Sequence, residues 1–331
     1  MPSYDRPYLS FEEQIIKLEK DYKLIIVNKD LALTYLRTVS YYDLINGYQE
    51  FFMKDGEFKE KIDITFLFKF YMFDKNIQTI LFKYSVYVEN AFKTIFSHEI
   101  SNSMGVNIDE YLNYRNYIDV SYLDDRGEKL ILLIKKIKSI ANKTGDNPTK
   151  HYRDTHNHIP AWILFKNVFF NDVFDLFTYL KKESKLKIID SFFKPNNLSD
   201  DDKIRLFKTT LTIVRKFRNK IAHNLKAISY KTPEKIIGEN LKKVLETGLL
   251  IKNDIKKNIG INDLYSMFLS EMLLLNNDFL KASLLNELYF LLSADSEIAK
   301  KYLEVANFPA TALERILRVQ TDIINRNIQF E

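Results

Sequence analysis

The stretch DITFLFKFYMFDKNIQTILFKYSVYVENAFKTIFSHEI, residues 63–100, decides the fold class of this chain. Its apolar residues recur at three- and four-residue spacing, which is the pattern of a helix. Aromatic residues are so frequent that we expect a long helix, buried around much of its circumference and capped by Asp63. Only eight glycines and seven prolines interrupt the 331 residues. The sequence therefore predicts an all-α protein.

Capping patterns predict where two other helices begin. Ser10 followed by Glu13 opens the segment FEEQIIKLEKDY. Ser199 followed by Asp202 opens a helix that we expect over about residues 200–225.

Three other segments complete the expected organisation. A helix is expected through LALTYLRTVSYYDLI, residues 31–45, and should stop near Gly47. The polar stretch TGDNPTKHYRDTHNH, residues 144–158, is expected to be a loop. Residues 256–331 are predicted to form a separate C-terminal helical extension.

Composition and charge narrow the class of protein. Hydrophobic residues make up 46% of the chain, enough for a sizeable core. The chain has no cysteine, which excludes disulfides, thiolate zinc sites and cysteine nucleophiles, and favours a reducing compartment. Because no signal peptide and no run of about 18 apolar residues is evident, we expect a soluble cytoplasmic protein without a membrane partner. The net charge of +5 permits a nucleic-acid partner without requiring one.

The segment RKFRNKIAHN, residues 215–224, places polar groups on the second of the capped helices. Arg218 falls within the margin of the apolar stripe, so its guanidinium needs a carboxylate or a phosphate as a partner. Glu89, in the long aromatic helix, is either this partner or a residue that faces solvent or fills a packing gap. At about 100° per residue, the stripe itself consists of Val214, Phe217, Ile221 and Leu225, with Leu211 at its edge.

Arg215, Asn219 and His223 follow one another on the polar face of the same helix. Arg218 and His223 are five residues apart, about 140° around an ideal helix, so a straight helix would not aim both at one phosphate. Either the helix ends or distorts at the AHN sequence, residues 222–224, or two copies of the helix cross at a dimer axis.

The histidine-rich stretch before residue 160 offers a competing site. Arg153 and His158 repeat the arginine–histidine spacing, so that spacing alone is not specific. His151, His156 and His158 match no strong zinc pattern, and we interpret the stretch as a polar loop rather than a metal site.

Aromatic and lysine-rich positions are interpreted first as structural. Trp162 is expected in the core rather than as a platform for a base. Tyr41 and Tyr42 are expected to pack, although either could line a cleft. The lysines of LIKKIKSIANK and KKESKLK are expected to be solvated.

Arg218, Asn219 and His223 resemble the R-x4-6-H motif of the HEPN superfamily of helical ribonucleases, in which a polar residue commonly follows the arginine. The wider sequence is similar to the Abi-like abortive-infection proteins of the AbiD/AbiF type over about residues 8–230. The chain departs from that pattern at Lys75 and Asn171. The matching blocks, in order, are FEEQIIKLEK, YLRTVSYYDLINGY, FYMFDKNIQTILFKYSVYVENAF, IPAWILFKNVFFNDVFDLF and FRNKIAHN.

This resemblance implies a HEPN-like helical bundle over residues 1–255, with the extension outside it. It further implies cleavage of RNA by a homodimer, without a metal or other cofactor. A role in phage abortive infection and association with a small noncoding RNA are implied as well.

The motif supplies groups that suit such a cleavage. His223 would act as general base or acid, Arg218 would hold phosphoryl oxygens, and Asn219 would fix the imidazole or the phosphate. The expected products carry a 2′,3′-cyclic phosphate and a 5′-hydroxyl. Glu89 would support these residues, and further RNA contacts are expected from Arg215, Lys220, Arg153, His158 and Tyr42.

Two alternatives remain open at this point. The protein could bind a structured noncoding RNA without cutting it, or it could be a helical interaction module in which Arg218 and His223 are structural. Only the nuclease requires His223 for turnover.

Overall fold

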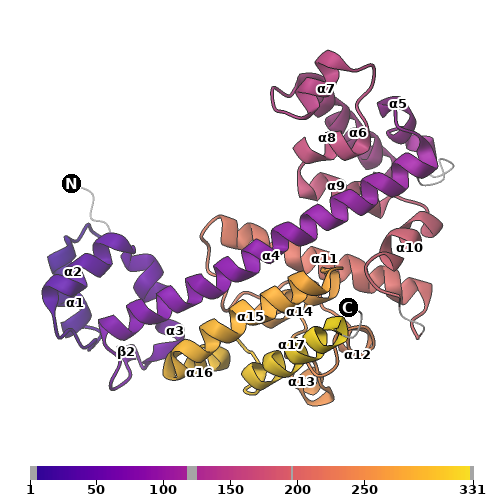
Figure 1. Ribbon diagram of the computed structural model, residues 1–331. Coiled ribbons are helices and arrows are strands. Elements are labelled where there is room, and N and C mark those ends of the chain that lie inside the picture. The colour runs from indigo at the N-terminus through magenta and orange to yellow at the C-terminus, as the bar shows by residue number, and fades with distance from the viewer. Residues whose placement is uncertain (1–5, 118–124, 195–196, 329–331) are drawn as a thin grey trace.

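The computed structural model describes residues 6–117, 125–194 and 197–328, and it is all-α, as predicted (Figure 1). Within these residues, the only β-structure is a two-residue antiparallel pairing of β1 with β2, apart from a single bridge between Ile25 and Asp63. The first elements are α1 (Phe11–Lys20), α2 (Lys29–Thr38), η1 (Tyr42–Asn46), α3 (Gln49–Phe52), β1 (Met53–Lys54), β2 (Glu57–Phe58) and α4 (Ile64–Met104). They are followed by α5 (Ile108–Tyr111), η2 (Tyr114–Asn116), α6 (Asp125–Lys143), α7 (Thr149–Thr155), α8 (Ala161–Asn167), α9 (Phe170–Thr178), α10 (Lys182–Asp190) and α11 (Asp200–Ala222). The C-terminal part contains α12 (Gly238–Lys242), α13 (Lys252–Lys256), α14 (Leu264–Leu274), α15 (Asp278–Ala294), α16 (Ser296–Val305) and α17 (Ala312–Ile328).

Helix α4 is the axis around which the other helices are arranged. It has 41 residues, so it is about 60 Å long. The predicted cap is confirmed, because the Asp63 side chain accepts a hydrogen bond from the Phe66 amide at 2.6 Å. Helices α1–α3 lie at its N-terminal end and α5–α8 at its C-terminal end, while α11, α14 and α15 pack along its middle (Figure 1).

The aromatic residues of α4 form the centre of the core. Phe92 is fully buried, and its ring centre lies between 5.6 and 6.1 Å from those of Phe96, Phe177 and Phe207. These partners come from α4, α9 and α11, so a single side chain joins three helices. The buried residues of α4 follow one face at three- and four-residue spacing, whereas Met72 and Tyr87 are exposed, so the expected burial around much of the circumference is confirmed only in part.

Both predicted capping patterns are present. The Ser10 hydroxyl accepts a hydrogen bond from the Glu13 amide at 3.2 Å, and the Glu13 carboxylate accepts one from the Ser10 amide at 2.7 Å. The Ser199 hydroxyl likewise accepts from the Asp202 amide at 3.2 Å, which begins α11.

The helix expected over residues 31–45 is interrupted. Helix α2 ends at Thr38, and Val39 has an extended backbone with φ −123° and ψ 126°. The Ser40 hydroxyl then accepts a hydrogen bond from the Asp43 amide at 3.1 Å, which starts a new turn that leads into the π-helix η1. A serine side chain that binds the backbone locally competes with continuous helix, and this explains the break.

The loop expected over residues 144–158 contains the helix α7, so that expectation is wrong in part. Pro148 directly precedes the helix, at a position where its fixed φ favours helix formation. Of the seven helical residues only Thr149 is buried, so the sequence has no apolar periodicity from which this helix could be predicted.

The C-terminal helices share the core of the preceding part. Every residue of α14 is buried, and this helix packs against α11 and α4. The Tyr302 hydroxyl of α16 donates a hydrogen bond at 2.9 Å to the buried Asp74 of α4, whose other carboxylate oxygen accepts from Tyr48 at 2.8 Å. A domain boundary between residues 255 and 256 stays a prediction. None of the described helices is both long enough and apolar enough to cross a bilayer.

Candidate active site

Helix α11 carries the motif and runs antiparallel to α4. Near its start the Phe207 ring contacts Phe92, whereas near its end the guanidinium carbon of Arg218 lies 5.8 Å from the ring centre of Phe82. Later residues of α11 therefore contact earlier residues of α4. The motif is placed beside the middle of the long helix, between two openings of the protein surface that are described below.

The helix ends within the motif. Ala222 is its last residue, and His223 follows with φ −93° and ψ 14°. Asn224 then has a φ of +54°, a left-handed conformation that asparagine tolerates better than most residues. Leu225 is consequently outside the helix and 51% exposed, so its expected place in the core stripe is wrong. Of the two arrangements predicted for the motif, the helix end at AHN is the one observed within a single chain.

Arg218 has the carboxylate partner that its position on the helix required. Its Nη2 lies 3.5 Å from Oε2 of Glu89, and its Nη1 donates a hydrogen bond to Oδ1 of Asn219 at 3.2 Å. The Arg218 side chain is nevertheless 32% exposed, and its buried Nε has no acceptor among the described residues. The guanidinium is thus held in place while one side stays open to an anionic ligand.

Glu89 links Arg218 to a second cation. Its Oε1 lies 2.8 Å from Nζ of Lys93, one turn further along α4. Lys93 also donates a hydrogen bond to the Val168 carbonyl at the end of α8, at 2.8 Å. Two cations around one carboxylate leave a net positive charge. Lys93 did not feature in the sequence prediction, although its four-residue spacing from Glu89 is a recognised signal for an ion pair.

His223 is exposed at the end of α11. Its imidazole makes no hydrogen bond or ion pair with any residue in the described part of the chain, and only its backbone amide is bound, to the Asn219 carbonyl at 3.2 Å. Asn219 therefore holds the guanidinium of Arg218 rather than the imidazole. The side chain of His223 is free to meet a substrate.

Two further basic residues of the motif segment, Arg215 and Lys220, lie against neighbouring aromatic rings. The Arg215 guanidinium lies 4.5 Å from the ring centre of Phe174 and 3.7 Å from the Asp175 carboxylate. Burial lowers the pKa of Arg215 below its usual range, although Asp175 opposes this shift. Lys220 lies 4.4 Å from the ring centre of Tyr230. Arg215 is mainly a packing residue here, whereas Lys220 also reaches an open cleft.

That cleft, of about 290 Å³, lies beside the end of α11. Tyr42 lines the edge of this cleft and is 74% exposed. Of the two predicted alternatives for this residue, packing in the core or lining a cleft, the second is the one observed. Lysines from α4, α11 and the segment after it contribute positive charge, and Asp43 and Asp74 contribute carboxylates. The lysines are Lys75, Lys220 and Lys226.

The second arginine–histidine pair lies elsewhere. Arg153 Nη1 donates to the carbonyls of Ala141 and Thr144 at 3.1 and 3.0 Å, so it caps the end of α6. His158 is hydrogen-bonded to the neighbouring Asn157 at 2.7 Å. The region around α7 lies at the C-terminal end of α4, whereas the end of α11 lies towards α1–α3, where Lys226 pairs with Glu50 at 2.5 Å (Figure 1). Arg153 and His158 are not brought together with Arg218.

The histidine stretch and Trp162 also differ from expectation. His151 and His156 have ring centres 5.7 Å apart, but among the described residues no three His, Asp or Glu side chains are grouped as metal ligands. Trp162 is 46% exposed, so its predicted core position is wrong. The buried residues of α8 are Ala161, Leu164 and Phe165, which turn Trp162 outward.

Comparison with known proteins gives one match. The sequence model of a family described as Abi-like protein matches residues 34–228, more than half of the chain. The match includes Glu89 and the whole motif segment. No curated protein and no solved structure matches the chain. The match points to abortive infection, that is, to phage defence.

Proposed function

Because this chain belongs to the Abi-like family, we propose that it is a metal-independent endoribonuclease of the HEPN type that acts in phage abortive infection. The observation that carries the proposal is the arrangement at the end of α11. A half-exposed guanidinium is fixed by Glu89 and Asn219, and an exposed histidine without intramolecular partners follows at the helix end. AbiD/AbiF-type members resemble this chain in the order of their sequence blocks.

The proposed reaction begins with an RNA phosphate bound to the open side of Arg218. The 2′-oxygen of the preceding ribose attacks phosphorus, its proton passes to a base, and the bond from phosphorus to the 5′-oxygen breaks as that oxygen receives a proton from an acid. Arg218 stabilises the negative charge that develops on the phosphoryl oxygens. The products carry a 2′,3′-cyclic phosphate and a 5′-hydroxyl.

This reaction needs a base and an acid, and one motif supplies one imidazole. A homodimer that brings two copies of α11 together would supply both, and it would also place two guanidinium groups around one phosphate. The single-chain geometry is compatible with this arrangement because His223 is exposed. We therefore propose that the active species is a homodimer.

The lysine-lined cleft supports a role for bound RNA. Three lysines and the exposed ring of Tyr42 surround an opening next to the motif. Lysine contacts to phosphates bind RNA without reading its sequence, and an exposed aromatic ring stacks on bases. A small noncoding RNA held here would lie beside the active site. The same cleft favours the alternative function, in which the protein binds a structured RNA without cutting it.

The proposal is tested by expressing the wild-type protein and Arg218→Ala in cells and comparing growth and RNA 3′ ends. The wild type should arrest growth and produce 2′,3′-cyclic phosphate ends, and Arg218→Ala should do neither. Lys129→Ala, which changes an exposed residue of α6, serves as the control. Intact RNA from the wild type, both with and without phage, together with a defined RNA that copurifies with the protein, would instead establish the binding function.

Glu89 should position Arg218 without contacting RNA. We expect Glu89→Gln to reduce the single-turnover cleavage rate about tenfold, because the guanidinium loses its charged anchor and its alignment. RNA affinity should stay equal or increase, since a negative charge is removed. Glu183→Gln, which alters an exposed ion pair with Lys187, is the matched control. An equal loss of affinity and rate would contradict a positioning role.

A further inference from the structure

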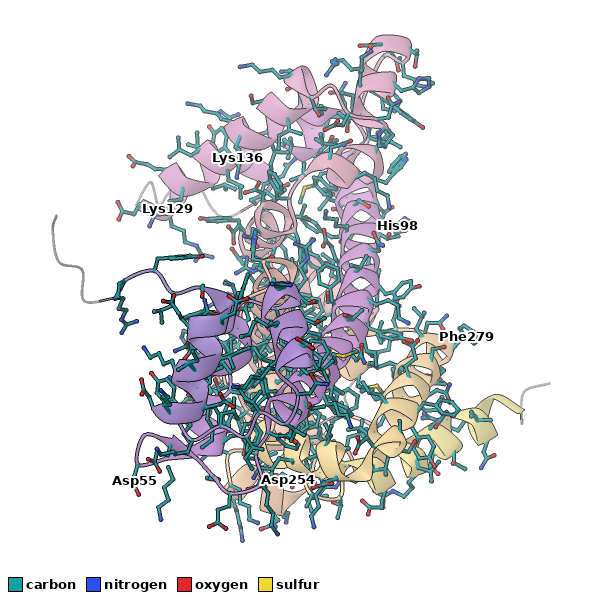
Figure 2. All side chains as sticks on the ribbon, turned by 90° about the vertical axis from the view of Figure 1, so that its left-hand side faces the viewer. Asp55, His98, Lys129, Lys136, Asp254 and Phe279 are labelled. Atoms are coloured by element: carbon teal, nitrogen blue, oxygen red, sulfur yellow. The ribbon has the colours of Figure 1, made fainter. Side chains whose placement is uncertain are left out.

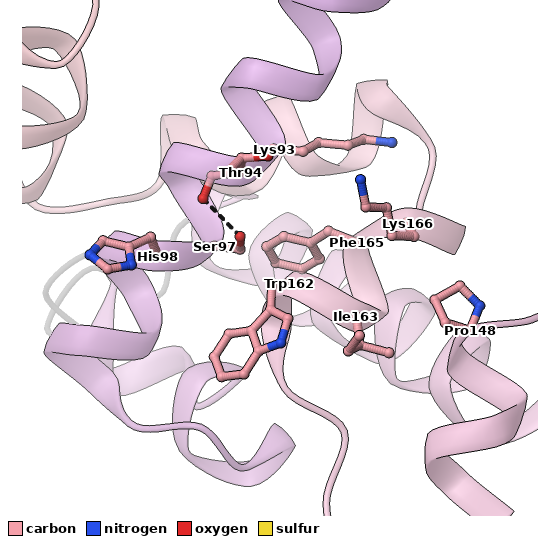
Figure 3. Close-up of a pocket in the computed structure, with 9 residues that line it drawn as sticks. All are labelled: Lys93, Thr94, Ser97, His98, Pro148, Trp162, Ile163, Phe165 and Lys166. Atoms are coloured by element: carbon pink, nitrogen blue, oxygen red, sulfur yellow. Dashed lines mark hydrogen bonds between the residues drawn. The ribbon is translucent and has the colours of Figure 1, made fainter.

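A cavity of about 390 Å³, shown in Figure 3, is lined by Lys93, the ion-pair partner of Glu89. Its walls come from α4 and α8, and its lining is mainly apolar and contains no carboxylate. We call it the Trp162 cavity. The residues that matter for its chemistry are Lys93, Ser97 and His98 of α4, with Trp162, Phe165 and Lys166 of α8.

The indole of Trp162 lines this cavity, and the residue is 46% exposed. Figure 3 shows it below Phe165, with His98 to its left and the two lysines beyond Phe165 at the upper right. Phe165 lines the same cavity and is buried, so α8 is anchored in the core at this point. An exposed aromatic face on a rigid helix is suited to stacking against a flat ring.

One lysine that is unpaired among the described residues and one histidine side chain line the cavity together with this aromatic ring. Lys166 is exposed and has no ion-pair partner among the described residues, and His98 projects away from α4 without a hydrogen bond to any of them (Figure 2). Lys93 is occupied by Glu89 and the Val168 carbonyl, so it contributes charge rather than a free donor. A ligand that satisfies all of these groups has a flat ring and an adjacent anion, which is the chemistry of a nucleotide.

Lys93 connects the cavity to the proposed active site through a chain of ion pairs. Lys93 both lines the cavity and pairs with Glu89, which in turn holds Arg218. From Glu89 to Ser97 the helix rises about 12 Å, a distance that a few nucleotides span. A strand whose scissile phosphate lay on Arg218 would therefore place a neighbouring base near Trp162.

We propose that the Trp162 cavity binds one unpaired base of single-stranded RNA, stacked on the indole with its phosphate at Lys166. The inference deepens the proposed function, because it rests on Arg218 as the site of the scissile phosphate. A free mononucleotide offers the same ring and anion, so the experiment separates these two sources.

Intrinsic fluorescence tests this proposal directly, because Trp162 is the only tryptophan of the chain. The full-length protein is titrated with a 2′-O-methylated single-stranded tetranucleotide, which cannot be cleaved through its 2′-oxygen. An abasic tetramer and adenosine and uridine monophosphates are titrated in parallel. We expect the tetranucleotide to quench emission at concentrations at which the abasic tetramer and the monophosphates do not.

Variants provide a second readout through the anisotropy of the same tetranucleotide carrying a dye. Trp162→Leu and Lys166→Ala should each weaken its binding about tenfold, as loss of one stacked base or one phosphate contact predicts. Phe169→Ala and Lys129→Ala are the controls and should bind normally. They remove an exposed aromatic ring and an exposed lysine that do not line the cavity, and Figure 2 shows Lys129 on the opposite side of the molecule from His98.

The outcomes separate this inference from the proposed function. Unchanged emission, together with normal binding by Trp162→Leu, overturns the RNA subsite even when the wild type cleaves RNA. Equal quenching by monophosphates and the tetranucleotide also overturns it and assigns the cavity to free nucleotides. Quenching by the tetranucleotide alone supports the subsite, and if no cleavage accompanies it, only the proposed nuclease fails.

Discussion

Replacing His223 with alanine is expected to lower the rate of RNA cleavage by about 10²–10⁴-fold, the range for loss of a general acid or base. The side chain is exposed and has no partner among the described residues, so its removal breaks no intramolecular contact. The free energy of unfolding should therefore change by less than about 0.5 kcal/mol. The measurement is single-turnover cleavage of a labelled RNA, with urea unfolding of the same preparations.

The control for this variant is His156→Ala, which removes another exposed histidine near α7. It should cleave RNA at the wild-type rate. RNA affinity of His223→Ala should stay within a few-fold of wild type, whereas Arg218→Ala should lose affinity as well as rate because it removes a phosphate contact. A His223→Ala protein that cleaves at the wild-type rate would eliminate the nuclease mechanism proposed for this motif.

The second large effect concerns the stability of the protein and its dependence on pH. Glu271 in α14 is fully buried, and neither of its carboxyl oxygens has a hydrogen-bond partner among the described residues. Burial raises the pKa of Glu271 well above its usual range. Leaving buried polar atoms unpaired costs about 1–3 kcal/mol. We therefore expect Glu271→Met to raise the free energy of unfolding at pH 7 by about that amount.

The sign of the pH dependence follows from the raised pKa. The folded protein binds the Glu271 proton more tightly than the unfolded chain does. Its contribution is fully present below the unfolded pKa and is lost as pH rises towards the folded pKa, by up to about 1.4 kcal/mol per pH unit. Glu271→Gln and Glu271→Met should both remove this decline from urea-unfolding curves measured between pH 4 and pH 8.

Comparison with the wild type isolates the effect of Glu271. Asp74 and Asp263 also have raised pKa values through burial, but they are present in all the proteins compared. Glu314→Met, which changes an exposed residue of α17, controls for the added apolar side chain. Parallel pH profiles for wild type and Glu271→Gln would show that Glu271 is not a buried, protonated carboxyl.

Local sequence predicted those features whose cause is local. The caps at Ser10, Asp63 and Ser199 are present because a side-chain oxygen and the amides that it binds are three residues apart. The pairing of Arg218 with Glu89 was one of two predicted alternatives for Glu89, since a guanidinium on an apolar margin requires a carboxylate or a phosphate. A contact between two helices could therefore be predicted, because a partly buried charged group needs a partner.

Several sequence predictions were wrong in short segments and at helix ends, where too few residues are present to give a periodic apolar pattern. Leu225 has the spacing of a core residue, but the helix ends three residues before it. Trp162 is apolar, yet the buried face of α8 is formed by its neighbours. Helix α7 has too few buried residues to produce a pattern. In each case the direction of a side chain depends on which neighbouring helix is present.

The sequence by itself determined that this protein is all-α, that α4 and α11 exist, and that Arg218 needs a carboxylate or a phosphate as a partner, because helix periodicity and desolvation act on the chain locally. Only the tertiary structure decided that α11 lies antiparallel to α4 and that Lys93 joins the Arg218–Glu89 pair to the Trp162 cavity. It also decided that Tyr42 and three lysines surround one cleft. These juxtapositions join residues from different helices that are far apart in the sequence, and they depend on how buried faces pack against each other.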